Sequence, residues 1–163
     1  MELKLLQNYL TSRTQFVKFK THNSNSLPVR TGVPQGSILG PLLFSIYIND
    51  LVHISNKLNF LMYADDTTIF FNLEDFSSEN RTTGVNNELE KINLWLKHNK
   101  LSLNIEKTKC MVFHTKQKSV PIHNFSINNA PIDNVNSFKF LGIVLDCNLS
   151  WKNHWRSLEY SIN

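Results

Sequence analysis

The sequence predicts an α+β fold in which helices pack on an antiparallel sheet. Apolar residues recur at helical spacing in residues 1–12, 38–51 and 79–99, and short β-rich segments separated by turn residues occupy most of the rest. Helices and strands do not alternate regularly, which favours this class over a doubly wound parallel sheet. With 163 residues, 41% of them hydrophobic, the chain is long and apolar enough for one domain with a core.

The N-terminal part predicts a helix followed by two strands. Leucines at helical spacing indicate a short amphipathic helix over residues 1–12. Apolar and basic residues alternate over residues 15–21, which predicts a strand whose polar face carries Lys18 and Lys20. After a polar loop, residues 27–31 can pair back as a second strand.

The middle of the chain predicts a turn, a buried helix and a hairpin. Two glycines and a proline in residues 32–36 indicate the turn. A helix is expected over residues 38–51 with Pro41 near its first turn, and because it is apolar on most sides we expect it to be buried. Residues 59–63 and 67–71 are rich in strand formers and predict the hairpin.

A second amphipathic helix is expected over residues 79–99, followed by strands. Its apolar residues recur every three or four positions and its charged residues fall opposite them: inward Val85, Leu89, Ile92 and Leu96; outward Glu88, Glu90 and Lys91. A strand over residues 109–114, a hairpin over 125–132 turning at an Asn-Asn pair, and a strand over 138–145 broken at Gly142 come next. A final helix is expected from residue 150 to the end.

Composition excludes several classes of protein. The net charge of +4 suits a polyanionic partner, but it is a weak signal because many globular domains are this basic. Cys110 and Cys147 form no CxxC pair and stand in no Cys/His cluster, so we expect free thiols rather than a zinc site. No signal peptide is recognisable, and the longest apolar stretch, residues 38–48, is interrupted and too short to span a membrane. We therefore expect an intracellular protein.

Two adjacent carboxylates, Asp65 and Asp66, lie at the tip of the predicted hairpin, in the sequence NFLMYADDTTIFF of residues 59–71. Adjacent anions repel, and near a core they need compensation, which a hard divalent cation such as Mg²⁺ provides. Two such ions can activate an attacking hydroxyl and stabilise a leaving pyrophosphate. An Asp pair can also merely cap a solvated turn, and the dipeptide alone does not decide between the two.

A glycine-hinged loop opens the helix expected at residues 38–51, in the sequence GVPQGSILGP of residues 32–41. Glycine lets a backbone approach another molecule closely, and a helix N-terminus offers free N–H groups to phosphate. Gln35 adds a side-chain donor and an acceptor. Glycine and proline alone also fit an ordinary joint between loop and helix.

Together, this loop–helix segment and the YADD hairpin resemble the reverse transcriptase family, and most of all the jockey-like reverse transcriptases of non-LTR retrotransposons. The similarity extends upstream to YLTSRTQFV at residues 9–17, and downstream to LSLNIEKTK at 101–109 and FKFLG at 138–142. These ordered blocks cover about residues 9–145. The resemblance implies a polymerase palm, an α+β fold that catalyses RNA-directed DNA synthesis from an RNA template, a DNA primer and deoxynucleoside triphosphates.

The resemblance also implies roles for individual residues near the hairpin. Asp65 and Asp66 would bind Mg²⁺ or Mn²⁺ for two-metal nucleotidyl transfer, with Asp65 the more critical. Four further residues would contact the nucleotides: Tyr63 and Ala64 beside the primer end, and Gln35 and Gly36 against the templating base and the incoming nucleotide.

Other implied roles fall on basic residues and on a downstream hairpin. Lys107 matches the lysine that follows the long helix and would neutralise or protonate the leaving pyrophosphate, although a solvated lysine explains it equally well. Lys18 and Lys20 are candidates for phosphate contacts, but a solvated strand face is the favoured interpretation for both. The primer grip, a hairpin that holds the growing strand, is matched by Phe140, Leu141 and Gly142.

The resemblance implies that residues 1–146 are the C-terminal part of the palm and that residues 147–163 begin the thumb or a connecting helix. Family members carry the fingers and the first half of the palm upstream, including another metal-binding aspartate on a strand beside the hairpin. We therefore expect this chain alone to have an unpaired sheet edge and little or no polymerase activity. The alternative function is a catalytically inactive remnant that at most binds nucleic acid. A metal-dependent nuclease would rest on the Asp pair alone.

Overall fold

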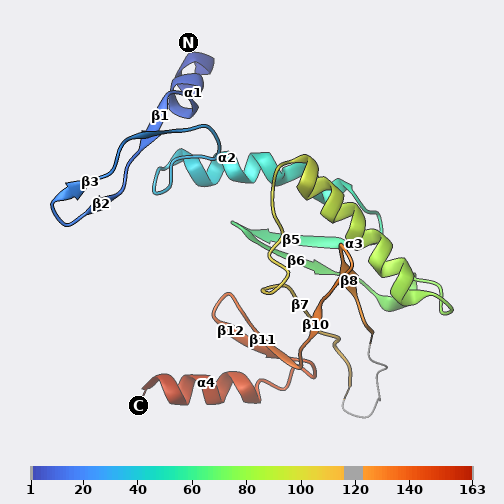
Figure 1. The fold of residues 1–163 in the computed structure, drawn as a ribbon. Helices are drawn as coiled ribbons and strands as arrows, with labels where there is room; N and C mark the ends of the chain where they lie inside the picture. Colours follow the sequence, from blue (N-terminus) through green and yellow to red (C-terminus); the bar gives the residue numbers. More distant parts are fainter. Residues whose placement is uncertain (1, 116–122, 163) are drawn as a thin grey trace. The chain divides into compact units, whose positions relative to one another are not determined.

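The computed structural model describes residues 2–115 and 123–162 and confirms a mixture of helices with small, mostly antiparallel sheets (Figure 1). The described strands form six two-stranded sheets, so the continuous sheet expected from the sequence is not present among these residues. The chain divides into two compact units, one made of Met1–Asp50 with Leu61–Thr68 and the other of Leu51–Phe60 with Ile69–Asn163. No helix in the described part of the chain is long and apolar enough to cross a membrane.

The first unit begins with the expected helix α1 (Glu2–Leu10) and a long hairpin. Its four short strands are β1 (Arg13–Gln15), which pairs with β4 (Leu27–Val29), and β2 (Lys18–Phe19), which pairs with β3 (His22–Asn23). The prediction of a polar loop at residues 22–26 is therefore wrong for His22 and Asn23. Lys20 has a φ of 52°, a left-handed conformation that ends β2 early and turns the chain back.

The helix expected at residues 38–51 is α2 (Leu39–Ile48), followed by the 3₁₀ turn η1 (Asn49–His53). The prediction that this helix is buried is wrong for the described residues, because Leu42 and Ile46 are 57% and 64% exposed. A helix that is apolar on most sides needs neighbours on most sides. Here its buried residues, Gly40 and Ile48, lie along one side only.

The predicted hairpin at residues 59–71 forms from β5 (Asn59–Tyr63) and β6 (Asp66–Phe70). The ends of both strands agree with the predicted ranges to within one residue. The short 3₁₀ turn η2 (Leu73–Asp75) follows, and Asn72 caps it by accepting a hydrogen bond from the Glu74 backbone N–H at 3.0 Å.

The core of the second unit is organised by α3 (Arg81–His98), the amphipathic helix expected at residues 79–99. Val85, Leu89 and Ile92 are buried as predicted. Other buried apolar residues belong to the segments around the helix: Leu51, Leu58, Phe76, Phe125, Ile127 and Ile132. Transferring these side chains out of water is the main favourable contribution to folding here.

The prediction that Glu88 faces solvent is wrong, since this residue is only 9% exposed. Lys91, one turn later on α3, donates a hydrogen bond to the Glu88 carboxylate at 2.8 Å. Burial raises the pKa of the Glu88 carboxyl, but the favourable interactions with Lys91, Ser55 and Lys57 outweigh it and leave this pKa below its ordinary value. Pairing of Oε1 with Lys91 thus offsets part of the cost of burying this carboxylate, while Oε2 has no hydrogen-bond partner among the described residues.

The hairpin predicted at residues 125–132 consists of β8 (Ser126–Ile127) and β9 (Ala130–Pro131). Its turn is the Asn-Asn pair, and both Asn128 (φ 53°) and Asn129 (φ 60°) adopt the left-handed conformation. Two positive φ angles characterise the hairpin turn that Asn tolerates better than most residues. The prediction of this turn is confirmed.

The remaining strands are β7 (Lys109–Cys110), which pairs in parallel with β10 (Asp133–Asn134), and β11 (Ser137–Phe140), which pairs in antiparallel fashion with β12 (Ile143–Asp146). The strand predicted at residues 109–114 is therefore shorter, and the break expected at Gly142 is a hairpin turn. The C-terminal helix is α4 (Lys152–Ile162), as expected from residue 150, while position 163 lies outside the described residues.

Candidate active site

The two adjacent aspartates sit where β5 turns into β6. Ala64 and Asp65 form the turn, and Asp66 is the first residue of β6. Ala64 has a φ of 53° although it carries a Cβ, so the turn holds a non-glycine residue in the left-handed region. Such a conformation costs about 1–2 kcal/mol for an L-amino acid. Backbone strain of this kind is found at functional sites more often than elsewhere.

Asp65 and Asp66 are both exposed. Within the described residues neither carboxylate has a hydrogen bond or an ion pair. Two unneutralised oxygen donors on neighbouring residues suit a hard divalent cation, because Mg²⁺ takes one or two carboxylates and completes its shell with water and substrate phosphates. Among the described residues, no cluster of three or more His, Cys, Asp or Glu side chains is placed to hold a metal.

The glycine-hinged loop lies in the same compact unit as the tip of the Asp hairpin. Gly32 and Gly36 have φ angles of 74° and 76°, which explains why glycine stands at both positions. Arg13 holds the start of this loop by donating hydrogen bonds to the carbonyl oxygens of Thr31 and Gly32, at 3.2 and 2.6 Å. Gln35 and Gly36 are exposed and therefore accessible to a ligand.

Ser37 organises the junction between this loop and α2, a role that the sequence motifs did not predict. Its hydroxyl accepts a hydrogen bond from the Gly40 backbone N–H at 3.1 Å, donates one to the Pro34 carbonyl at 2.6 Å, and is hydrogen bonded to the Tyr9 hydroxyl of α1. A Cβ on Gly40 would lie 2.9 Å from this hydroxyl oxygen, so only glycine fits. A serine three residues before a helical N–H is a capping signal that could have indicated this role.

The other predicted site residues belong to the second unit. Lys107 is exposed in a tight turn, where its backbone N–H donates to the Asn104 side chain at 3.2 Å. The predicted primer grip coincides with the turn between β11 and β12, where Leu141 and Gly142 have φ angles of 45° and 87° and are exposed. Phe140 is half-buried beside them. The relation of these residues to the aspartates stays a prediction.

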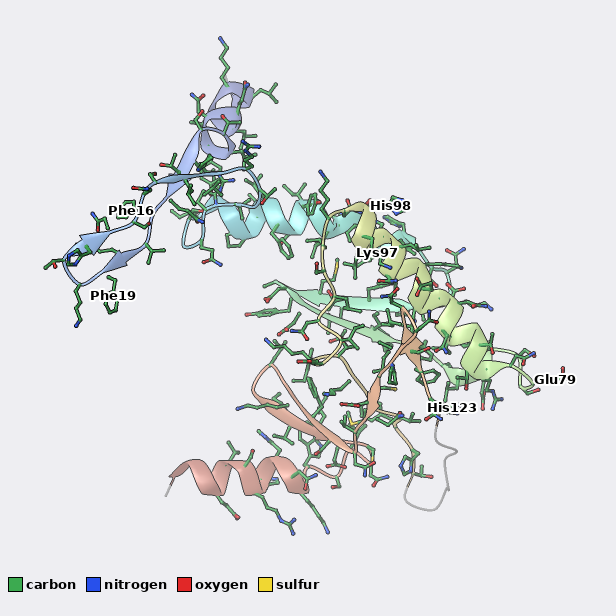
Figure 2. All side chains as sticks on the ribbon, viewed as in Figure 1. Phe16, Phe19, Glu79, Lys97, His98 and His123 are labelled. Atoms are coloured by element: carbon green, nitrogen blue, oxygen red, sulfur yellow. The ribbon has the colours of Figure 1, made fainter. Side chains whose placement is uncertain are left out.

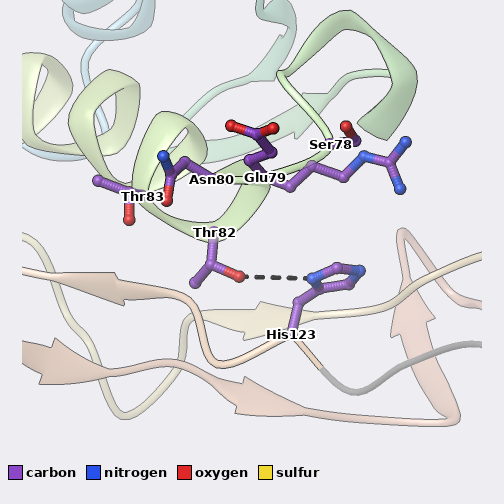
Figure 3. Close-up of a pocket in the computed structure, with 7 residues that line it drawn as sticks. Ser78, Glu79, Asn80, Thr82, Thr83 and His123 are labelled. Carbon is purple, nitrogen blue, oxygen red and sulfur yellow. Dashed lines mark hydrogen bonds between the residues drawn. The ribbon is translucent and has the colours of Figure 1, made fainter.

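A shallow pocket at the start of α3 contains none of the predicted site residues (Figure 3). Thr82 and His123 are hydrogen bonded across it, with the threonine hydroxyl 3.4 Å from His123 Nδ1. The residues that line it come from the loop before α3, its first turn and the segment after residue 122: Ser78, Glu79, Asn80, Arg81, Thr82, Thr83 and His123. The candidate active site therefore rests on the hairpin and the loop, not on this pocket.

Comparison with known families agrees with these motifs. Residues 1–145 match the model of the reverse transcriptase (RNA-dependent DNA polymerase) family. The chain belongs to the reverse transcriptase family. The resemblance to enzymes of non-LTR retrotransposons is confirmed by its relatives as well.

Three curated relatives come from Drosophila melanogaster. The RNA-directed DNA polymerase from mobile element jockey is 28% identical over 162 residues, which are 95% of this chain and 17% of that protein. The probable RNA-directed DNA polymerases from transposons X-element and BS are 29% and 32% identical, over 92% and 94% of this chain and 16% and 17% of their own lengths. The chain thus spans about one sixth of the relatives it matches. No solved structure matches it at a significant level.

Proposed function

We propose that this chain is the palm segment of an RNA-directed DNA polymerase and that Asp65 and Asp66 are its catalytic carboxylates. The observation that carries the proposal is the pair of adjacent, exposed carboxylates at the hairpin turn. Ala64, at a φ of 53°, is followed by two adjacent aspartates whose exposed carboxylates have no partner among the described residues, in a chain whose first 145 residues match the reverse transcriptase family. Positive φ angles at non-glycine residues also occur at other turns, such as Lys20 and Asn128, so the support comes from the carboxylate pair together with the family match.

In this proposal Asp65 and Asp66 hold Mg²⁺ or Mn²⁺ through their carboxylate oxygens. A bound pair of such ions supplies Lewis-acid stabilisation to the attacking primer hydroxyl and to the leaving pyrophosphate. The carboxylates themselves would contribute the negative charge that favours metal binding, and the turn fixes the backbone from which they project. Asp65 lies within the turn and Asp66 begins β6, so their backbone positions are determined by the same hairpin.

The neighbouring residues would position the substrates. Tyr63 and Ala64 would lie beside the primer end, while Gln35 and Gly36 would lie against the templating base and the incoming deoxynucleoside triphosphate. Lys107, an exposed cation without a partner among the described residues, would neutralise charge on the leaving pyrophosphate. The primer grip is proposed to be Phe140, Leu141 and Gly142.

Primer extension tests this proposal with the 163-residue chain, a poly(rA) template, an oligo(dT) primer and Mg²⁺. Asp65→Asn removes one carboxylate charge without changing side-chain size. The adjacent acids Glu74 and Asp75 provide a matched control, since both are exposed on η2. Extension that is lost in Asp65→Asn and kept in Glu74→Gln supports the proposal. Extension that survives Asp65→Asn contradicts it, and a folded chain with no extension supports the inactive remnant.

A further inference from the structure

The hairpin of residues 13–30, called the arm from here on, carries a surface that the proposed active site does not use. Two ladders, β1 with β4 and β2 with β3, run in line along it. Between them Val17 and Ser24 are joined by two hydrogen bonds, both 2.9 Å long. The eight residues from Arg13 to Lys20 run from the base to the turn, so the arm is at most roughly 25 Å long.

The arm is cationic along its length. It contains Arg13, Lys18, Lys20 and Arg30, with His22 near the tip and neither Asp nor Glu. Arg13 is engaged at the base by backbone carbonyl oxygens of the following loop. The other cations are exposed, and no acidic side chain of the arm neutralises them. A polyanion is the partner that such a charge distribution favours.

The arm also exposes aromatic rings, which a merely solvated strand face would not need. Phe16 is 55% exposed and Phe19 is 69% exposed, and Figure 2 shows both side chains on the arm. The ammonium group of Lys20 lies 5.5 Å from the centre of the Phe19 ring. Phe19 pairs with His22 across the turn. Flat rings therefore alternate with cations over the outer half of the arm.

We infer that the arm binds single-stranded nucleic acid, with Phe16 and Phe19 stacking on bases while Lys18 and Lys20 contact phosphates. Exposed rings stack on unpaired bases and cations follow the backbone, which is how proteins hold single strands without reading sequence. Bases in a duplex are already stacked, so their faces are not available to the two rings. The inference rests on the proposed function in expecting a nucleic-acid partner, but it requires neither metal nor catalysis.

Fluorescence anisotropy with a labelled 20-nucleotide single-stranded RNA and the 163-residue chain tests the stacking. The double substitution Phe16→Ala/Phe19→Ala is expected to weaken binding about tenfold or more, since each lost base stack is costly. Phe113→Ala is the matched control, because Phe113 is 52% exposed and lies outside the arm. Equal affinity of the Phe16/Phe19 variant and the wild type, or an equal loss in Phe113→Ala, overturns the inference.

The salt dependence of the same binding tests the phosphate contacts. Lys18→Gln/Lys20→Gln is expected to reduce the slope of log affinity against log salt by about 1.4, since each phosphate contact on a single strand contributes about 0.7. Lys4→Gln, an exposed lysine on α1, should leave the slope closer to that of the wild type. An unchanged slope in the double variant overturns the inference, as does tighter binding to a blunt DNA duplex or to vesicles of anionic lipid.

These results are distinguishable from failure of the proposed function. Glu74→Gln should bind the RNA as the wild type does, because Glu74 lies outside both the arm and the proposed active site. A folded chain that binds RNA through the arm but does not extend a primer would support this inference and, for catalysis, the inactive remnant. If the chain extends a primer while the arm substitutions leave RNA binding unchanged, catalysis is supported and this inference is contradicted.

Discussion

At the scale of single residues, Ala64 is the most informative position. It adopts a left-handed φ of 53° next to Asp65, although glycine would adopt that angle without strain. Among residues that carry a Cβ, one with a small side chain such as alanine is the least strained at this angle. Alanine also has fewer accessible backbone conformations than glycine, which restricts the conformation of the turn. The sequence could show the Asp pair, but the strained angle depends on how β5 and β6 close, so it emerges only from the structure.

Substitution of Ala64 tests this view of the turn. Ala64→Val is expected to destabilise the protein by about 1–3 kcal/mol, because a β-branched residue is poorly accommodated at positive φ. Ala64→Gly should be near neutral, since relief of about 1–2 kcal/mol of strain is offset by about 0.5–1 kcal/mol of added chain entropy. Urea unfolding of the wild type and of the two variants measures both changes in the free energy of unfolding. A valine variant as stable as the glycine variant would show that the turn is not strained.

Asp146 provides a prediction about pH. Its carboxylate accepts hydrogen bonds from the Ser150 backbone N–H at 3.0 and 3.1 Å and from the Asn148 backbone N–H at 3.1 Å. The Ser150 backbone hydrogen bond is the main cause that lowers the pKa of Asp146, and it outweighs the effect of burial. A lowered folded-state pKa adds stability above the ordinary value of about 3.9 and loses it as the pH falls through the folded value.

Thermal unfolding of the wild type and Asp146→Asn between pH 7 and pH 2 checks this. The wild type should be the more stable at neutral pH, and the difference in Tm should shrink as the pH falls below about 4. The exposed Asp75→Asn variant serves as the comparison. A difference between wild type and Asp146→Asn that stays constant over this range would mean that the charge of Asp146 is not what stabilises the loop before α4.

At the scale of elements, a set of polar side chains on α3 ties the helix to the β8–β9 hairpin. The Asn86 side chain accepts a hydrogen bond from the Ser126 backbone N–H at 3.0 Å and donates one to the Ser126 hydroxyl at 3.1 Å. One turn later, Glu90 accepts a hydrogen bond from the Asn128 backbone N–H at 3.0 Å. These contacts satisfy backbone groups that a two-stranded sheet leaves open.

Asn86→Ala is expected to destabilise the protein by about 2 kcal/mol, because two hydrogen bonds are lost and the half-buried Ser126 N–H loses its partner. Asn87→Ala removes the same amide from an exposed position next to it on α3. Chemical denaturation of both variants gives the comparison. If the two variants lose the same stability, the Asn86 contacts do not hold the helix to the hairpin.

The same elements show what the sequence could predict. Periodicity predicted α3 and its buried Val85, and the Asn-Asn pair predicted the turn at residues 128–129, because these depend on local geometry. The burial of Glu88 and the exposure of α2 were not predictable from the pattern. Each depends on which distant segments come to lie against the helix, and the sequence of the helix does not contain that information.

At the scale of the whole molecule, motif and fold contribute differently to the site. The short sequence segments that resemble the family identify it and its candidate residues, because each segment can be recognised by itself. Distances between residues of different blocks depend on packing over long range, so the relation of Lys107 to Asp65 stays a prediction. Ser37 and the aromatic residues of the arm lay outside the predicted site, since their roles follow from contacts and exposure.

Mn²⁺ binding, followed by electron paramagnetic resonance of the free ion during titration of the 163-residue chain, tests most directly whether the hairpin carboxylates form a metal site. We predict that the chain binds Mn²⁺ and that Asp65→Asn/Asp66→Asn loses this binding. Glu74→Gln/Asp75→Asn removes an equally exposed pair of adjacent acids and should retain it. Equal loss in the two double variants, or binding that persists without Asp65 and Asp66, would contradict the assignment of these residues as the catalytic carboxylates.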